Sequence, residues 1–388
     1  MITRRRWILG AAGIAKGANR EVAYGQAVIP AGIRSRFVDG VNGLRVHILE
    51  AGFETENRPC LLLLHGFPEL ALVWSKVMLP LAAAGYRVVA PDLRGFGRTT
   101  GWDRNYDGDL RPFGTMNMVR DTLGLVWGLG YRTVAAVIGR DAGSPLAGWC
   151  AMLRPDVFRS VVMMTAPFAG APSLTAGAAV NLDAQLAALA PARKHYTGYY
   201  STREAEGNMM RCPLGLKEFF RGYFFQKSAD WKGNTPVPLR ARTGEEMARM
   251  PRYYIMDRAK GMCETVGARM PTAAERGAWL SEEELDVFAS EYGRTGFQGG
   301  LNYYRRGADA KLTAELEVFS GRTIDVPAAF IGGTSDWGVY QTPGALEAMR
   351  TKVCTKMTGV HMVAGAGHWV QQEKPEEVSR LLLDFLAR

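Results

Sequence analysis

Residues 133–154 read TVAAVIGRDAGSPLAGWCAMLR. The first seven form a short apolar run that predicts a buried strand, and the residues from Ser144 onward have helical character. Between them lies the turn GRDAG, in which glycines stand two residues before and two residues after Asp141. This spacing is typical of a nucleophile elbow, a strained strand-to-helix turn that lifts one side chain above a sheet. The sequence therefore predicts that Asp141 is presented as a nucleophile.

A carboxylate at this position limits the chemistry. Its attack on an ester carbonyl would give an unstable anhydride, whereas its attack on a saturated carbon gives an ester that water can cleave. Asp141 therefore favours alkyl transfer over acyl transfer.

Further apolar runs alternate with stretches of helical period. They read CLLLLHG (60–66), YRVVAPDLRG (86–95), SVVMMTAP (160–167), VPAAFIGG (326–333) and VHMVAGAGH (360–368). Such runs are typical of parallel strands that are buried on both faces, and their alternation with helices predicts an α/β fold with a doubly wound, mostly parallel sheet. The segments SRFVDG and LRVHILEAG, on either side of Asn42 and Gly43, predict an antiparallel hairpin before it.

The segment between SVVMMTAP and VPAAFIGG has a different composition. It is rich in Tyr, Met and Arg and contains helical pieces such as SEEELDVFASEYG, in which Ser281 and Glu284 form a capping box. We expect a leader at 1–30, a first core segment at 31–167, a helical cap at 168–323 and a second core segment at 324–388.

Composition excludes several classes of protein. Of 388 residues, 47% are apolar and 22% are charged, and no apolar run is long enough to span a membrane. The net charge of +9 is spread along the chain, so nucleic-acid binding is not expected. Five cysteines without metal-ligand spacing predict neither a disulfide framework nor a zinc site: Cys60, Cys150, Cys212, Cys263 and Cys354.

The N-terminus resembles a twin-arginine export signal. Arg4, Arg5 and Arg6 precede the short apolar run WILGAAGIA. A signal would send the protein to the periplasm or outside the cell, and a plain basic leader would leave it in the cytoplasm. The sequence decides neither this nor the oligomeric state, and a homodimer stays open.

Hydrolysis of an aspartyl ester needs an activated water, and therefore a histidine and an orienting acid after the elbow. His368 lies in the loop GAGHW, and Asp336 follows the VPAAFIGG strand in TSDWG. Asp325 precedes that strand and so lies at the opposite end of the sheet. In HGFPE, residues 65–69, the Phe67 N–H is the expected oxyanion donor, with the Ala142 N–H as the second.

These motifs together, with PDLRGFGRT at 91–99, resemble those of the α/β-hydrolase-fold epoxide hydrolases, which are relatives of the haloalkane and fluoroacetate dehalogenases. The resemblance implies two cap tyrosines that hydrogen-bond the epoxide oxygen. HYTGYY (195–200) is similar to the segment that bears the first, which would be Tyr196. GFQGGLNYYRR (296–306) is similar to the segment that bears the second, which would be Tyr304.

The leaving group separates the two branches of this family. An opening epoxide needs O–H donors, whereas a departing halide needs weak N–H donors, typically from tryptophan. Position 142, where haloalkane dehalogenases place a tryptophan, is alanine, and HYTGYY lacks the tryptophan that fluoroacetate dehalogenases carry. Epoxide hydrolases also often carry a tryptophan after the nucleophile, so Ala142 departs from both branches.

We therefore expect a hydrolase that opens an apolar epoxide to a vicinal diol through an ester on Asp141, with no metal or organic cofactor. Hydrolytic dehalogenation through the same ester is the nearest alternative. A non-catalytic or slow ligand-binding receptor on this fold is the alternative from another class.

Overall fold

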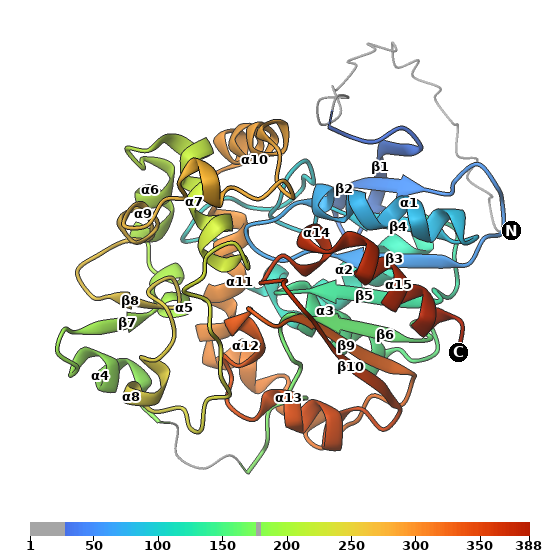
Figure 1. Ribbon diagram of the computed structural model, residues 1–388. Helices are drawn as coiled ribbons and strands as arrows, with labels where there is room; N and C mark the ends of the chain where they lie inside the picture. Colours follow the sequence, from blue (N-terminus) through green and yellow to red (C-terminus); the bar gives the residue numbers. More distant parts are fainter. Residues whose placement is uncertain (1–27, 176–179) are drawn as a thin grey trace, which may run out of the picture.

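The computed structural model describes residues 28–175 and 180–388, so the expected export signal at Arg4–Arg6 lies outside the described residues. The core is an eight-stranded sheet in the order β1-β2-β4-β3-β5-β6-β9-β10 (Figure 1). Its strands are β1 (Ile33–Val41), β2 (Leu44–Ala51), β3 (Cys60–Leu64), β4 (Arg87–Pro91), β5 (Ala136–Arg140), β6 (Val161–Met164), β9 (Ala328–Gly333) and β10 (Met357–Val363).

The strand directions confirm the predicted α/β sheet. β1 pairs antiparallel with β2, β2 pairs antiparallel with β4, and all later pairs are parallel. The hairpin turns at Asn42 and Gly43, whose φ angles of 50° and 80° lie in the left-handed region that asparagine and glycine tolerate. Each parallel connection needs a crossover, which the chain makes with helices.

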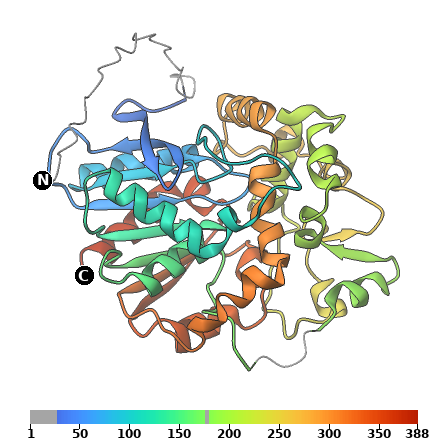
Figure 2. The ribbon, with the colours of Figure 1, turned by 180° about the vertical axis from the view of Figure 1, so that it is seen from behind.

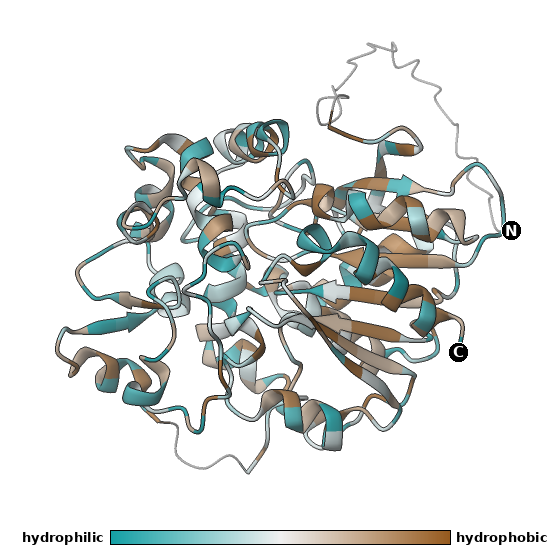
Figure 3. Cartoon of the chain, in the orientation of Figure 1, coloured by the Kyte–Doolittle hydropathy of each residue, from teal (hydrophilic) through white to brown (hydrophobic). Residues whose placement is uncertain are grey.

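Helices cover both faces of the sheet. α1 (Ser75–Ala83) and α15 (Pro375–Leu386) lie on the face nearer the viewer in Figure 1. α2 (Thr115–Gly128) and α3 (Gly143–Leu153) lie on the other face, which Figure 2 turns toward the viewer. The strands between these layers are mostly apolar, whereas the helices carry hydrophilic residues among apolar ones (Figure 3). This is the pattern expected when a sheet is buried on both faces.

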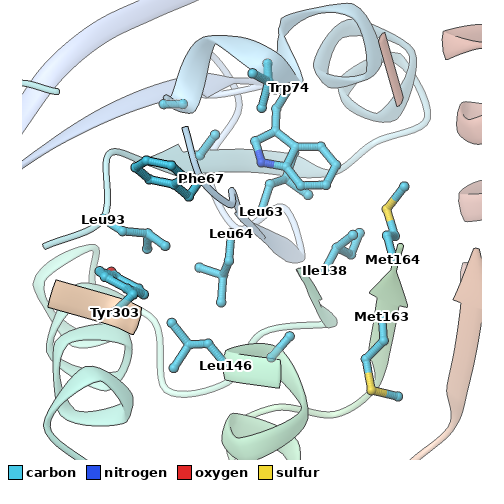
Figure 4. Close-up of a cluster of buried hydrophobic side chains, with 14 of the residues drawn as sticks. Leu63, Leu64, Phe67, Trp74, Leu93, Ile138, Leu146, Met163, Met164 and Tyr303 are labelled. Atoms are coloured by element: carbon cyan, nitrogen blue, oxygen red, sulfur yellow. The ribbon is translucent and has the colours of Figure 1, made fainter. Parts of the chain in front are cut away.

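The apolar core lies along the central strands and beneath the loops that follow them. Leu63, Leu64, Ile138, Met163 and Met164 are at most 1% exposed, and they form one cluster in Figure 4. Phe67 and Tyr303 extend the same cluster toward the cap. Burial of each such side chain stabilises the fold by roughly 1.5–3 kcal/mol, so the core fixes the strand ends from which the site is built.

The segment between β6 and β9 forms the cap beside the sheet (Figure 1). It contains a two-stranded sheet of β7 (Arg193–His195) and β8 (Ile255–Asp257). Its helices are α4 (Leu182–Ala187), α5 (Tyr196–Tyr200), α6 (Glu204–Met210), α7 (Gly215–Lys227), α8 (Gly244–Met247), α9 (Met262–Gly267), α10 (Glu282–Thr295), α11 (Gln298–Ala308) and α12 (Ala310–Ala314). Ser281 caps α10 in the predicted capping box with Glu284.

The cap meets the core through glycines. A Cβ atom on Gly299, in α11, would lie 1.9 Å from the carbonyl oxygen of Gly95, in the loop after β4. Only a residue without a side chain allows this backbone approach. The helix that carries Tyr304 is therefore held directly against the loops at the ends of the strands.

One expectation is wrong: the cap contains a disulfide bond between Cys212 and Cys263. The two cysteines are 51 residues apart, and they meet because the end of α6 packs near α9. Spacing along the chain carries no signal for such a pair. Cys60, Cys150 and Cys354 are free and buried.

None of the helices in residues 28–175 and 180–388 is both long enough and apolar enough to cross a membrane.

Candidate active site

Asp141 lies in the turn between β5 and α3. Its φ of 52° is a left-handed conformation that is unusual for a residue other than glycine. The turn can form because Gly143 has no side chain: a Cβ atom there would lie 2.3 Å from the carbonyl oxygen of Leu64, in β3. Such backbone strain persists only where the surroundings hold it in place. The left-handed turn directs the Asp141 carboxylate toward the end of the sheet that the cap contacts.

His368 lies between two carboxylates. Its Nε2 is 3.3 Å from Oδ2 of Asp141, and its Nδ1 is 3.0 Å from Oδ1 of Asp336. Asp336 follows β9 and His368 follows β10, so the two meet because neighbouring parallel strands end at the same edge. The Gly338 N–H donates to the same Oδ1 of Asp336 at 2.6 Å. Since His368 and Asp336 are each 1% exposed, their contact is shielded from solvent.

The two oxygens of the Asp141 carboxylate have different partners. Oδ1 accepts a hydrogen bond of 2.9 Å from the Phe67 N–H, whereas Oδ2 faces His368. This approach depends on Gly66, since a Cβ atom there would lie 2.4 Å from the Asp141 side chain. Ala142 is the N-cap residue of α3, so its N–H lies outside the hydrogen bonds of that helix. Both expected oxyanion donors therefore border Asp141.

The charge of Asp141 is held by its neighbours. Burial alone would raise its pKa, but the contact with His368 and the positive charges of Arg140 and Lys227 lower the pKa below its ordinary range. The side chain thus stays ionised at neutral pH, as a nucleophile must.

Tyr196 and Tyr304 meet over the site from different parts of the cap. Tyr196 begins α5 and Tyr304 lies in α11, and their ring centroids are 5.8 Å apart. The Tyr304 ring also lies edge-on to Phe67, with centroids 5.4 Å apart. By contrast, Tyr303 turns into the core, where its hydroxyl donates to the Arg94 carbonyl at 3.2 Å.

Both tyrosines stay protonated. Burial raises the pKa of Tyr196 well above its ordinary value, and the negative charge of Asp141 raises it further. Burial also raises the pKa of Tyr304 well above its ordinary value, and the nearby Tyr196 and Asp141 raise it further. The Tyr196 hydroxyl donates to Oε1 of Gln341 at 3.1 Å, a partner that sequence reasoning missed. The two phenols are therefore neutral donors near a carboxylate.

A buried ion pair holds two loops of the site in place, and the sequence did not indicate this role. Arg140 Nη1 lies 2.6 Å from Oε2 of Glu69, and both side chains are fully buried. Arg140 Nη2 donates to the His368 carbonyl, and Glu69 accepts from the Gly66 N–H at 2.8 Å. One pair thus fixes both the histidine loop and the loop that bears Phe67. The only sequence signal was an arginine in an otherwise apolar strand.

Lys227 is a further residue whose place near the site the sequence did not reveal. It ends α7 and is 3% exposed, although lysine is seldom buried. Its apolar neighbours in YFFQKSADW concealed it within a helical pattern. Within residues 28–175 and 180–388, no group of three or more His, Cys, Asp or Glu side chains is arranged to hold a metal ion.

Comparison with known proteins gives three findings. Residues 59–375 match the model of the alpha/beta hydrolase fold family. The chain is 33% identical over 355 residues to epoxide hydrolase B of Mycobacterium tuberculosis, covering 89% of this chain and 96% of that protein. It is also 33% identical over 357 residues to epoxide hydrolase 2 of Siraitia grosvenorii, with the same coverage.

Solved structures agree with the sequence relatives. An epoxide hydrolase from an endophytic Streptomyces matches with a TM-score of 0.75 and 30% identity, covering 92% of this chain and 96% of that one. Epoxide hydrolase A from Mycobacterium thermoresistibile matches with a TM-score of 0.70 and 28% identity, covering 92% of this chain and 98% of that one.

Proposed function

The chain belongs to the α/β-hydrolase-fold epoxide hydrolases, and from this membership we propose that it opens an epoxide to a vicinal diol through a covalent ester on Asp141. The observation that carries this mechanism is the division of the Asp141 carboxylate, with Oδ1 on the Phe67 N–H and Oδ2 toward His368. One oxygen is thus held by a backbone donor while the other is available to attack.

In the first half-reaction, Oδ2 of Asp141 attacks a ring carbon and the carbon–oxygen bond of the epoxide breaks. The departing oxygen takes a proton from one of the two cap phenols, Tyr196 and Tyr304. Burial supports this role, because phenols with raised pKa values are protonated at neutral pH and an alkoxide is basic enough to take their proton. The product is a hydroxyalkyl ester of Asp141.

In the second half-reaction, His368 Nε2 takes a proton from water, and the resulting hydroxide adds to the carbonyl carbon (Cγ) of the Asp141 ester. The carbonyl oxygen Oδ1 becomes an oxyanion held by the N–H groups of Phe67 and Ala142. The intermediate collapses by breaking the bond between the carbonyl carbon and the alkyl oxygen, the former Oδ2, which takes the remaining proton of the added water and leaves with the diol. This regenerates the carboxylate with one oxygen from water. Asp336, 3.0 Å from Nδ1, stabilises the imidazolium that forms. His368 then transfers the proton that it took from water to the tyrosinate formed in the first half-reaction.

Hydrolytic dehalogenation would use the same ester, but the two protonated phenols over Asp141 favour an oxygen leaving group. An epoxide panel assayed for diol, beside a haloalkane and haloacid panel assayed for halide, separates the two activities. Multiple turnovers separate both from a ligand-binding receptor.

The mechanism is tested by a single turnover in water enriched in heavy oxygen, with enzyme in excess over epoxide. We expect a diol without the heavy isotope and an Asp141 peptide that has gained one heavy oxygen. Asp141→Asn, with its carboxylate replaced by an amide, should form no ester. A labelled diol from an unlabelled Asp141 peptide would mean direct attack by water, and the covalent mechanism would fail.

A further inference from the structure

Lys227 lies beside the proposed catalytic histidine. Its carbonyl accepts a hydrogen bond of 2.9 Å from the His368 N–H, so the end of α7 is joined to the histidine loop. A Cβ atom on Gly367 would lie 2.6 Å from the same carbonyl, so the two backbones are in direct contact. This contact fixes where the Lys227 side chain begins.

The side chain ends among tyrosine rings of the cap. Its Nζ lies 4.7 Å from the ring centroid of Tyr254, 4.8 Å from Tyr223, 5.5 Å from Tyr196 and 5.7 Å from Tyr253. Ring faces attract a cation. Two of the hydroxyls donate elsewhere, from Tyr196 to Gln341 and from Tyr253 to Asn234. The ammonium therefore sits in an aromatic cage that includes one of the two proposed epoxide-binding phenols.

No hydrogen bond or ion pair joins Nζ of Lys227 to another residue in the described part of the chain. An ammonium has three donors, and aromatic faces offset only part of the cost of removing it from water. The nearby carboxylates are Asp141, whose titration Lys227 influences, and Asp336 beyond His368. Arg140, a second buried cation near Asp141, is already paired with Glu69. Lys227 is thus a buried cation near Asp141 whose ammonium donors have no hydrogen-bond acceptor among the described residues.

We propose that Lys227 binds a carboxylate of the substrate, so that the preferred substrates are epoxides that carry a carboxylate on a chain or ring attached to the epoxide. This rests on the proposed function and adds a substrate class to it. A neutral substrate offers the Lys227 ammonium no anion to bind, whereas an anionic one would be repelled by Asp141 and Asp336. The charge of Lys227, at the end of α7 in the cap, offsets that repulsion.

The test compares matched pairs of substrates. Terminal epoxy acids of increasing chain length, together with 4-carboxystyrene oxide, are each assayed beside the corresponding carboxamide, which has the same shape without the charge. We expect the acid of at least one pair to have the higher kcat/KM by roughly 10- to 100-fold, the range of a hydrogen bond to a charged group.

Lys227→Met should remove this preference, because it keeps an unbranched side chain only one atom shorter and loses the charge. The acid should fall to within about threefold of the amide, because only the acid loses an ion pair in addition to any loss that both substrates share through Asp141 and Tyr196. Lys227→Arg keeps the positive charge and should retain the preference. It keeps the test decisive if the methionine variant fails to fold. Lys232→Met, at an exposed lysine of the same segment, is the matched control and should behave as the wild type.

Binding separates this proposal from the epoxide chemistry. Calorimetric titration with 3-phenylpropanoate and with 3-phenylpropanamide needs no turnover. Tighter binding of the acid that is lost in Lys227→Met supports the carboxylate site even if no epoxide is hydrolysed, in which case only the proposed function fails. Equal binding of acid and amide, or an equal fall in turnover of both in Lys227→Met, overturns the carboxylate site.

Discussion

Asp336→Asn should separate the two half-reactions. In the native site, Oδ1 of Asp336 receives both the Gly338 N–H at 2.6 Å and His368 Nδ1 at 3.0 Å. In the variant, the amide oxygen takes this position, because an amide NH2 group there would face the Gly338 donor. His368 keeps its acceptor and its tautomer, and only the negative charge is lost.

The magnitude follows from Coulomb's law. An imidazolium and a carboxylate with charge centres about 4 Å apart interact by about 4 kcal/mol at an effective dielectric constant near 20. That energy corresponds to a roughly 10³-fold loss of rate. Loss of the tautomer as well would bring the decrease closer to 10⁴-fold. The loss falls on ester hydrolysis, because only that step places a positive charge on His368.

Rapid-quench kinetics with intact-protein mass spectrometry measures both steps. We expect Asp336→Asn to form the ester at close to the wild-type rate, to accumulate nearly one equivalent of it and to turn over roughly 10³-fold more slowly. The control is Asp325→Asn, whose carboxylate precedes β9 and accepts a hydrogen bond of 2.8 Å from Thr355 instead. Turnover within tenfold of wild type, or slow turnover without accumulated ester, would refute the assignment of Asp336.

Four further outcomes are expected. Tyr304→Phe should lower the rate of ester formation about 10²-fold through loss of one donor to the alkoxide, measured in single turnovers beside Tyr303→Phe, which should leave the rate unchanged. Glu69→Gln leaves Arg140 buried without its anion and should destabilise the protein by about 3–5 kcal/mol in urea unfolding; an unchanged midpoint would contradict the role of this pair. Burial lowers the pKa of His195 from 6.5 to about 4, so the folded state binds fewer protons than the unfolded state between these two pH values. The wild type should therefore lose stability relative to His195→Asn as the pH falls from 6.5 to about 4. Stability profiles of the two proteins that stay parallel over this pH range would exclude the effect. Cys212→Ser opens a 51-residue loop and should lower the free energy of unfolding by about 4 kcal/mol. The denatured wild type, titrated without reduction, should show three free thiols. Five free thiols would contradict the disulfide.

The sequence determined the parts of this protein that depend on local pattern. The apolar runs set the parallel strands because a strand buried on both faces must be apolar throughout. The GRDAG turn and the residues after the last two core strands indicated Asp141, Asp336 and His368 because, in a parallel sheet, residues that follow strands at one edge converge. The cap tyrosines came from family resemblance, since an aromatic residue in a helical segment fits a packed core equally well.

Only the tertiary structure decided what depends on contacts between distant segments. The pairing of Cys212 with Cys263 and of Glu69 with Arg140 has no periodic signal, because each arises where separate elements pack together. Lys227 belongs to this group as well: along the chain it is one lysine in a helix, and only the folded cap surrounds its charge with four tyrosines beside His368. Local sequence sets strands, helices and turns, whereas burial and the pairing of charge are properties of the whole packed chain.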